Sequence, residues 1–448
     1  MTRQFKKIKI VALASVLVFG FGGVVKAAPS KSANLQAERQ QLFNKMMQQP
    51  GNLEIGFSYA ALSIRVGDLE GAVSTLERML IFSPGLPRLQ LELGILYYRL
   101  GNFDTARSYF KDAMSGPKTS SVIKLKAQEY LAVVDKKLER FVWSTNRFVG
   151  LRWQSNANSA PGKSIILSQG DPYTLTGSSI KKSDFSFVTT GNAHMEYDLY
   201  HQGDKIELDY VDFGTLHFNV SRYDAFVSEL TIGPSFNLGR FEIDETFAGV
   251  YGIVNGALLD GKTYFGTLGV GTRLVSRPQE DLELVMKAEY RHQWFNNTAK
   301  RKNATDRNGD EFRVVGDVKY KFSSTFAGII GGRVSRADRK VSYYDYWEYG
   351  GRVRFDWAIN PLDMTSELPW VLTASAGYLH RDYDTPDPVV SLTKTQNDNE
   401  YWAGGILKVP LSKSWAFMPK VEYRQVNSNN PVRDYNAFTA TIGVQFSR

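Results

Sequence analysis

The hydrophobic positions of the chain follow two different periods, and the change falls near residue 140. Residues 28–140 show the spacing of amphipathic helices, and this spacing disappears from residue 145 onward. Beyond that point apolar and polar residues alternate, as in strands whose successive side chains point to opposite faces. The pattern predicts two domains of different class, a helical domain over residues 28–140 and a β domain over residues 141–448.

The alternation is clearest in residues 346–357, YWEYGGRVRFDW. One face is apolar and aromatic and the other is charged, with Trp347, Tyr349, Val353, Phe355 and Trp357 against Glu348, Arg352, Arg354 and Asp356. Repeated segments of this kind, separated by turn residues, are typical of an antiparallel transmembrane β-barrel with an apolar face in lipid and a polar face in the lumen. A soluble β-sandwich is the alternative, and it would have to expose many aromatic residues on one face.

The segments number about fourteen. Their approximate spans are 146–154, 184–199, 205–213, 224–236, 240–253, 262–274, 281–294, 311–322, 325–334, 344–357, 370–382, 398–409, 415–426 and 434–446. The polar faces mix both signs of charge, and we expect them to line the lumen with Lys287, Glu289, Arg291, Lys319, Lys321, Glu348, Arg352, Arg354, Asp356, Lys420, Glu422 and Arg424.

The connections between the predicted strands differ in length. Short ones follow the second, fourth and eighth strands, and long ones follow the first, seventh and eleventh, at 155–183, 295–310 and 383–397. Short turns of outer-membrane barrels lie in the periplasm and long loops lie outside the cell. The helical domain enters the first strand from the short-turn side, so we expect it in the periplasm.

The helical region repeats with a period of 34 residues. Small and large apolar residues recur at this spacing in the pairs Gly67/Gly101, Ala72/Ala106 and Leu76/Phe110. The period and these residue types resemble the tetratricopeptide repeat. We expect two full repeats at 54–87 and 88–121, a half repeat before them at 35–50 and a closing helix at 122–140.

A tetratricopeptide array presents a groove lined by the first helix of each hairpin. The residues expected on that face are Phe57, Ile64, Arg65, Leu91, Tyr98 and Arg99. They predict either a groove that binds a peptide or protein, or side chains that pack on the barrel or on the preceding helix.

The first residues have the pattern of a secretory signal peptide. Arg3, Lys6, Lys7 and Lys9 precede an apolar run over residues 10–25, and small residues at Val25 and Ala27 predict cleavage before Ala28. A membrane anchor is the alternative, although the run is shorter than the ~20 residues of a spanning helix. We therefore expect residues 1–27 to direct export in a Gram-negative bacterium.

Composition limits the chemistry that the chain supports. It has no cysteine, which excludes disulfides, thiolate metal sites and thiol nucleophiles. Its five histidines show no metal-ligand spacing, and no HExxH or GxSxG motif occurs. The net charge of +8 is spread along the chain rather than concentrated in a nucleic-acid-binding patch. We expect no enzyme activity, no cofactor, no metal and no nucleic-acid partner.

Three short motifs connect the two domains. Pro87 to Leu93 reads Pro-x-x-x-Leu-Glu-Leu, Phe103 to Phe110 reads Phe-x-x-Ala-x-x-x-Phe, and Asn156 to Pro161 reads Asn-x-Asn-x-Ala-Pro. This order of repeats, motifs and barrel resembles the surface lipoprotein assembly modifier family, the outer-membrane translocators of type XI secretion. The resemblance implies an outer-membrane barrel, placed by the barrel assembly machinery, that exports a surface lipoprotein or a soluble secreted protein.

Three functions remain open on the sequence. The first is a protein translocator whose client is held by the periplasmic repeats. The second is a polysaccharide exporter, in which helical repeats also precede a barrel, although the mixed lumen charges fit a charged polymer poorly. The third is a passive porin-like channel with an accessory helical domain.

Overall fold

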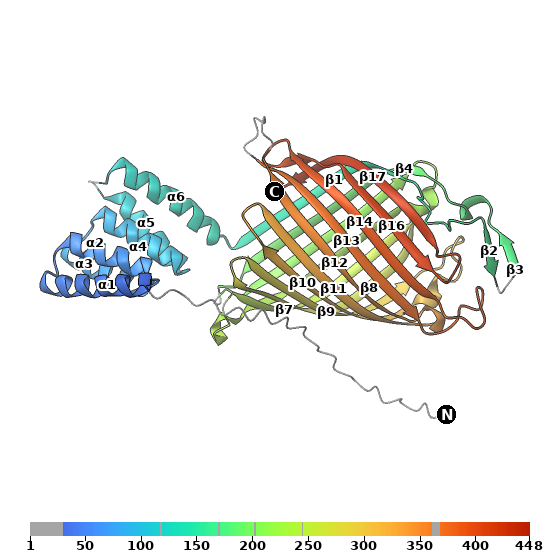
Figure 1. Ribbon diagram of the computed structural model, residues 1–448, viewed down its shortest axis with the longest axis horizontal. Coiled ribbons are helices and arrows are strands. Elements are labelled where there is room, and N and C mark those ends of the chain that lie inside the picture. Colours follow the sequence, from blue (N-terminus) through green and yellow to red (C-terminus); the bar gives the residue numbers. More distant parts are fainter. Residues whose placement is uncertain (1–29, 117–118, 169–170, 201–202, 244, 361–367) are drawn as a thin grey trace, which may run out of the picture. The chain divides into compact units, whose positions relative to one another are not determined.

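The computed structural model describes residues 30–116, 119–168, 171–200, 203–243, 245–360 and 368–448 (Figure 1). The predicted signal peptide, residues 1–27, lies outside these ranges. The chain forms two compact units, Met1–Glu139 and Arg140–Arg448. Among the described residues, no helix combines the length and the hydropathy needed to cross a membrane.

The first unit consists of six helices in the described residues, and each helix packs against the next in sequence. This arrangement confirms the predicted helical repeat fold. The helices are α1 (Ser30–Gln48), α2 (Leu53–Arg65), α3 (Leu69–Phe82), α4 (Pro87–Arg99), α5 (Phe103–Ser115) and α6 (Ser121–Lys137).

The turns inside the two hairpins explain the repeated glycine. Gly67 and Gly101 have φ values of +86° and +75°, a left-handed conformation that glycine adopts without steric cost. The next helix then begins after an Asp or Asn cap, and Asp68 accepts a 2.8 Å hydrogen bond from the Gly71 amide. The same turn therefore appears once per repeat, which is why the sequence shows the period.

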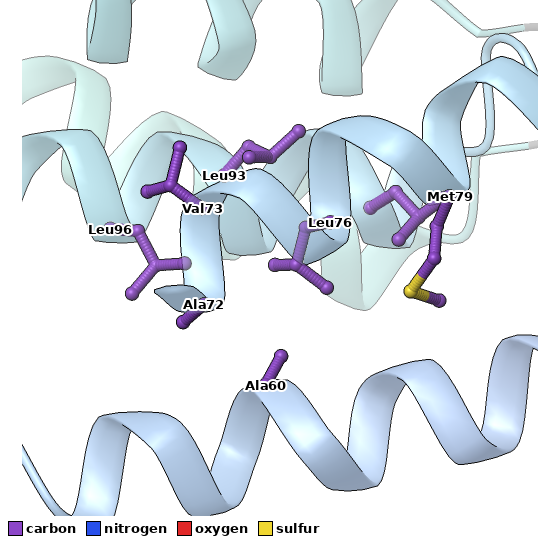
Figure 2. Close-up of a cluster of buried hydrophobic side chains, with 8 residues drawn as sticks. Ala60, Ala72, Val73, Leu76, Met79, Leu93 and Leu96 are labelled. Atoms are coloured by element: carbon purple, nitrogen blue, oxygen red, sulfur yellow. The ribbon is translucent and has the colours of Figure 1, made fainter. Parts of the chain in front are cut away.

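The other repeated positions fill the core between helices. Ala72, Ala106 and Phe110 are fully buried, and Leu76 is 1% exposed. Figure 2 shows Ala60 of α2 pointing toward the α3 side chains Ala72 and Leu76. Small residues on one helix of each hairpin thus admit a large apolar residue from the other, and burial of these side chains stabilises the array.

The second unit is a closed antiparallel β-barrel, as the alternating pattern predicted. Its strands pair in chain order, and β1 closes the sheet by pairing with β17. The barrel strands are β1 (Phe141–Gln154), β4 (Asp184–Asp198), β5 (Lys205–His217), β6 (Ala225–Asn237), β7 (Thr246–Leu259), β8 (Lys262–Gln279), β9 (Leu282–Phe295), β10 (Gly309–Lys321), β11 (Phe326–Arg339), β12 (Tyr346–Ile359), β13 (Trp370–Tyr383), β14 (Asn397–Pro410), β15 (Trp415–Phe417), β16 (Lys420–Ser428) and β17 (Tyr435–Ser447).

Segments β15 and β16 are two parts of one interrupted strand, so the barrel has 14 strands. Both segments pair with β14 on one side and β17 on the other. The interruption falls at Met418 and Pro419, because proline has no amide hydrogen to donate to the ladder. Hydrogen bonds from the Met418 amide to the Gly443 carbonyl (2.8 Å) and from the Leu407 amide to the Pro419 carbonyl (3.0 Å) keep the sheet continuous.

Most outward positions of the strands are apolar, and most inward positions are polar. On β12, Trp347 is 51% exposed and Trp357 is 54% exposed, whereas Glu348 on the alternate face is 6% exposed. Exposed aromatic and aliphatic residues at alternate positions on the other strands form the same outer surface. This outer face is the apolar band of a membrane barrel.

One strand, β7, is displaced from its predicted span. The pattern predicted a strand at 240–253, but Leu238–Phe241 forms a 3-10 helix and β7 begins at Thr246. The Asn237 side chain ends the preceding strand by accepting a 2.9 Å hydrogen bond from the Gly239 amide. Apolar residues in this turn, such as Phe241, imitate the start of an alternating segment.

The long connection 155–183 contains structure of its own. Its Asn-x-Asn-x-Ala-Pro motif folds back on the barrel, and Asn156 is 1% exposed. The Asn156 amide donates to the carbonyls of Ala160 (2.8 Å) and Asn436 (3.0 Å), which ties the loop to the start of β17. A short hairpin, β2 (Ile165–Ser168) and β3 (Asp171–Thr174), follows the motif and was not predicted.

Candidate functional site

Two arginines of the predicted groove lie at equivalent positions of the helical unit. Arg65 ends α2 and Arg99 ends α4, and both side chains are exposed. Neither forms an ion pair with another part of the chain that the structure describes.

Two apolar groove residues take part in packing within the repeats. Phe57 and Ile64 are half-buried against the cluster of α2, α3 and α4 side chains shown in Figure 2. The Arg88 guanidinium lies 4.4 Å from the centre of the Phe57 ring, close enough for a cation–π contact. Phe57 thus joins the packing of α2 to a charged side chain on α4.

The placement of Leu91 on an open face is wrong. Leu91 is 4% exposed and belongs to a cluster with Ala106 and Phe110 of α5 and Val134 of α6. Its side chain points between α4 and its C-terminal neighbours because the closing helix α6 covers that face. Leu91 therefore packs on the helices that follow it in the sequence, which neither interpretation predicted.

Tyr98 is intermediate between the two interpretations. It is half-buried, and its ring lies 5.7 Å from that of Phe103 and 5.8 Å from that of Tyr130. These contacts hold the ring in place next to Arg99. Tyr98 therefore packs on α5 and α6 while keeping part of its surface exposed.

A hydrogen-bonded group that the sequence did not indicate lies between α3 and α4. The Tyr97 hydroxyl donates a 2.6 Å hydrogen bond to Glu77, and the Tyr97 ring stacks on Tyr109 at 5.6 Å. The hydrogen bond to Glu77 raises the pKa of Tyr97 to about 12. Burial, followed by the charge of Glu77, raises the pKa of Tyr109. The group joins the two repeats through a polar contact.

The predicted lumen residues lie on the inner face of the barrel, and many of them form ion pairs. Arg291 of β9 contacts Glu289 at 2.9 Å and Glu229 of β6 at 2.6 Å. The second contact skips two strands, which only side chains that cross the interior achieve. Glu348 of β12 contacts both Arg333 (2.8 Å) and Arg381 (2.5 Å) of neighbouring strands.

The remaining charged members divide into paired and unpaired residues. Arg352 of β12 reaches Asp317 of β10 at 2.8 Å, and Arg354 pairs with Asp356 at 2.9 Å on the same strand. Arg424 pairs with Glu422 at 3.1 Å and also with Glu400. Within the described ranges no carboxylate forms an ion pair with any of the four lysines Lys287, Lys319, Lys321 and Lys420.

One ion pair on the outer face was not predicted. Arg147 of β1 and Asp212 of β5 lie 2.6 Å apart above Gly191, the central residue of β4. On the same face of β4, Phe185 and Phe187 are 46% and 56% exposed. The two charges are 65 residues apart in the sequence, so only the strand pairing brings them together.

The histidines of the barrel wall lie beside carboxylates. His194 lies between Asp209 (2.5 Å) and Glu196 (2.7 Å) on the inner face, and His292 lies 2.6 Å from Asp310 on the outer face. In the described part of the chain, no group of three or more potential ligands is placed to hold a metal ion. The histidines that the structure places are partners of carboxylates in the barrel wall.

Together, the closed antiparallel barrel, its apolar outer face and its charged interior define an outer-membrane β-barrel protein preceded by tetratricopeptide-like helices. The model of the surface lipoprotein assembly modifier family matches residues 143–448, which is more than half of the chain. The chain therefore belongs to the surface lipoprotein assembly modifier family, as the motifs at the domain junction suggested.

Solved structures resemble each unit separately. The Yersinia enterocolitica type III secretion chaperone SycD, in complex with a peptide of the translocator YopD, is 13% identical over 24% of this chain and 85% of that chain, with a TM-score of 0.23. The KdgM porin in complex with disordered oligogalacturonate is 8% identical over 68% and 99%, with a TM-score of 0.29. The anion-selective porin from Comamonas acidovorans is 8% identical over 69% and 99%, with a TM-score of 0.33. No curated protein matches the sequence.

Proposed function

We propose that this protein delivers a protein client, a surface lipoprotein or a soluble secreted protein, to the cell surface. The observation that carries the proposal is membership of the surface lipoprotein assembly modifier family over the whole barrel. A helical repeat unit directly before the barrel supports it, because such repeats present extended surfaces to protein partners.

In this proposal the helical unit lies in the periplasm. The chain enters β1 at Phe141 and leaves β17 at Ser447, so both ends belong to the same rim of the barrel. That rim also carries short connections, such as the one between β10 and β11, whereas the long connections 155–183, 296–308 and 384–396 lie at the opposite rim. Short periplasmic turns and long external loops are the rule for outer-membrane barrels.

The client is held, in the same proposal, by the face that carries Arg65 and Arg99. These exposed arginines lie one repeat apart, and side chains at equivalent positions line up along one face of a solenoid. Tyr98 lies beside Arg99 as an aromatic contact. Arginine and tyrosine are enriched among the residues that contribute most to protein interfaces. An extended or acidic client segment suits this face.

The test measures surface or medium accumulation of an epitope-tagged lipoprotein or secreted protein encoded beside this protein. Deleting residues 35–140 should abolish accumulation, and Arg65→Glu with Arg99→Glu should reduce it about tenfold or more. The matched control is Lys111→Glu with Lys126→Glu, which reverses two exposed cations on α5 and α6. Heat-modifiable gel mobility reports whether the barrel itself has assembled.

Normal accumulation from the deletion strain would contradict a delivery role for the helical unit and would favour a passive channel. Loss of a surface polysaccharide, with protein accumulation intact, would favour a polysaccharide exporter instead. An equal loss of client accumulation in the Lys111→Glu, Lys126→Glu control would show that the two arginine positions have no special role.

A further inference from the structure

The barrel interior contains a cavity beside the seam where β1 pairs with β17. Its volume is about 440 Å³, and residues from β1, β4, β5, β13, β14, β16 and β17 line it. These strands are neighbours around the closure, so their inward side chains converge on one region of the lumen. We call this space the lumenal cavity. Its volume is in the range of small-ligand sites.

One wall of the lumenal cavity is apolar, which is unusual for a lumen lined with ion pairs. Phe148 is 3% exposed and Val188 is 6% exposed, and both pack in one cluster with Phe213 and Ile406. Gly150 of β1 faces Gly443 of β17 under the Phe148 ring, and a side chain on either glycine would meet the ring and the partner backbone. The glycine pair thus makes room for Phe148 on the inner wall.

Two cations border this apolar wall without a carboxylate partner. Lys420 places its Nζ 3.4 Å from the centre of the Phe148 ring. Arg152 donates hydrogen bonds to two hydroxyls, those of Ser186 at 3.1 Å and Thr215 at 2.7 Å. Across the residues that the structure describes, neither cation forms an ion pair. Both are only half-exposed, so their charges are partly desolvated.

The carboxylate that lines the same cavity already forms an ion pair. Glu422 pairs with Arg424 at 3.1 Å, and Arg424 also contacts Glu400. Glu400 in turn contacts Arg381 at 3.6 Å, so both carboxylates are already paired with arginines. Arg152 and Lys420 therefore leave the cavity with an excess of positive charge. Partly desolvated charges are stabilised when an opposite charge approaches them.

We propose that the lumenal cavity binds an acidic side chain next to an aromatic side chain on a peptide segment of the transported client. The carboxylate lies between Arg152 and Lys420, and the aromatic ring packs on Phe148, Val188 and Phe213. Hydroxyls of Thr190, Thr439 and Thr441 also line the cavity and hydrogen-bond the peptide backbone. This inference rests on the proposed function, because it assumes that a polypeptide enters the barrel.

The experiment uses the purified full-length protein and the capped dipeptide N-acetyl-Phe-Asp-amide, with N-acetyl-Phe-Asn-amide as the uncharged isostere. Saturation-transfer NMR in detergent solution measures binding of both probes without requiring export. We expect the Asp probe to bind about tenfold more tightly than the Asn probe, the difference that a charged hydrogen bond contributes. Octanoate serves as a third probe, for a carboxylate carried by a lipid chain.

The variant Arg152→Gln with Lys420→Gln should remove the preference for Asp and leave weak binding of both dipeptides. The control Lys287→Gln with Lys319→Gln removes two lumen cations that do not line the cavity and should keep the preference. Phe148→Leu should weaken both dipeptides equally. Heat-modifiable mobility of each variant confirms that the barrel has folded.

Equal binding of the Asp and Asn probes by the wild type would overturn the proposal. So would a preference that survives in Arg152→Gln with Lys420→Gln. Binding of octanoate but of neither dipeptide would assign the cavity to a lipid carboxylate and overturn the peptide assignment. Since these results do not depend on client accumulation, loss of the proposed function and loss of this site are distinguishable.

Discussion

Gly94 sets how closely the two helices of the second repeat approach. A Cβ atom at this position would lie 2.6 Å from the Phe110 ring, well inside van der Waals contact. The ring is fully buried and has no room to move away. A side chain at Gly94 therefore forces the α4–α5 pair apart rather than filling a gap.

We expect Gly94→Val to destabilise the helical unit by about 1–3 kcal/mol, the usual cost of overpacking a core. Gly51→Val is the matched control, because no atom lies within 4 Å of a Cβ placed there. Urea unfolding followed by far-ultraviolet circular dichroism of the helices measures both variants. A Gly94 variant as stable as the wild type would show that the helices tolerate a wider spacing.

The hydrogen bond between Tyr97 and Glu77 predicts a pH dependence. The bond raises the pKa of Tyr97 from 10.0 to about 12, so the folded chain retains a proton that the unfolded chain releases. The stabilisation is fully present below pH 10 and decreases as the pH rises toward 12. We expect Glu77→Gln to lower the pKa of Tyr97 toward 10, measured as tyrosinate absorbance against a Tyr97→Phe reference. An unchanged titration would mean that Glu77 does not hold the proton in solution.

Sequence patterns identified core positions better than contacts between distant side chains. Ala72, Ala106 and Phe110 were recognisable because the fold repeats and their environment repeats with it. The burial of Leu91 could not be predicted from the sequence, because it depends on how α6 covers α4. The Arg147–Asp212 pair could not be predicted either, since its partners meet only after β1, β4 and β5 have paired.

At the scale of elements, strands were predictable because each lies between lipid and an aqueous lumen. Two environments on opposite faces impose alternation on the strands, and all fourteen predicted spans overlap observed strands, although β1, β8 and β11 extend five residues beyond their predicted spans. The largest displacement is at β7, where apolar turn residues extended the pattern backward. The interruption at Pro419 left no sign in the alternation, because the inward and outward residues resume in phase after it.

The face assignment yields a test within one strand. Ile329 and Ile330 are neighbours on β11, and Ile330 is 63% exposed on the outer face next to Val353 and Val318. Ile329 faces inward beside Arg354 and Lys319. We expect Ile330→Glu to destabilise the barrel by about 1–2 kcal/mol, less than the ~2–4 kcal/mol of a lipid-facing arginine. Ile329→Glu should cost less, because two cations flank it.

Refolding into lipid vesicles, followed by heat-modifiable mobility, compares the two variants under identical conditions. Both variants replace an isoleucine by glutamate at adjacent positions. A difference in the amount of folded barrel therefore depends on which face of β11 carries the glutamate. Equal losses of folded barrel in the two variants would contradict the assignment of Ile329 to the inner face and Ile330 to the outer face.

At the scale of the whole molecule, an even number of strands places the entry of β1 and the end of β17 at one rim. The orientation of the barrel in the membrane therefore determines on which side of the membrane the helical unit lies, and one topology measurement tests both. The rim of long connections includes 296–308, and the rim of short ones includes the turn 322–325 between β10 and β11. Two connections depart from this rule. The two-residue turn Asp260–Gly261, whose positive φ values fit a tight hairpin, lies at the long-loop rim, and the ten-residue connection 360–369 lies at the short-turn rim.

Single cysteines report the orientation without background, because the natural chain contains none. Asn303 lies in a long loop and Ser323 in a short turn, and both are exposed. On intact cells, a membrane-impermeant maleimide should label Asn303→Cys and leave Ser323→Cys unlabelled, and permeabilised cells should label both. Labelling of Ser323→Cys alone on intact cells would reverse the barrel and place the helical unit outside the cell. That result would leave Arg65 and Arg99 facing the medium, where they would meet a client only after its export, and would exclude the delivery role proposed for them.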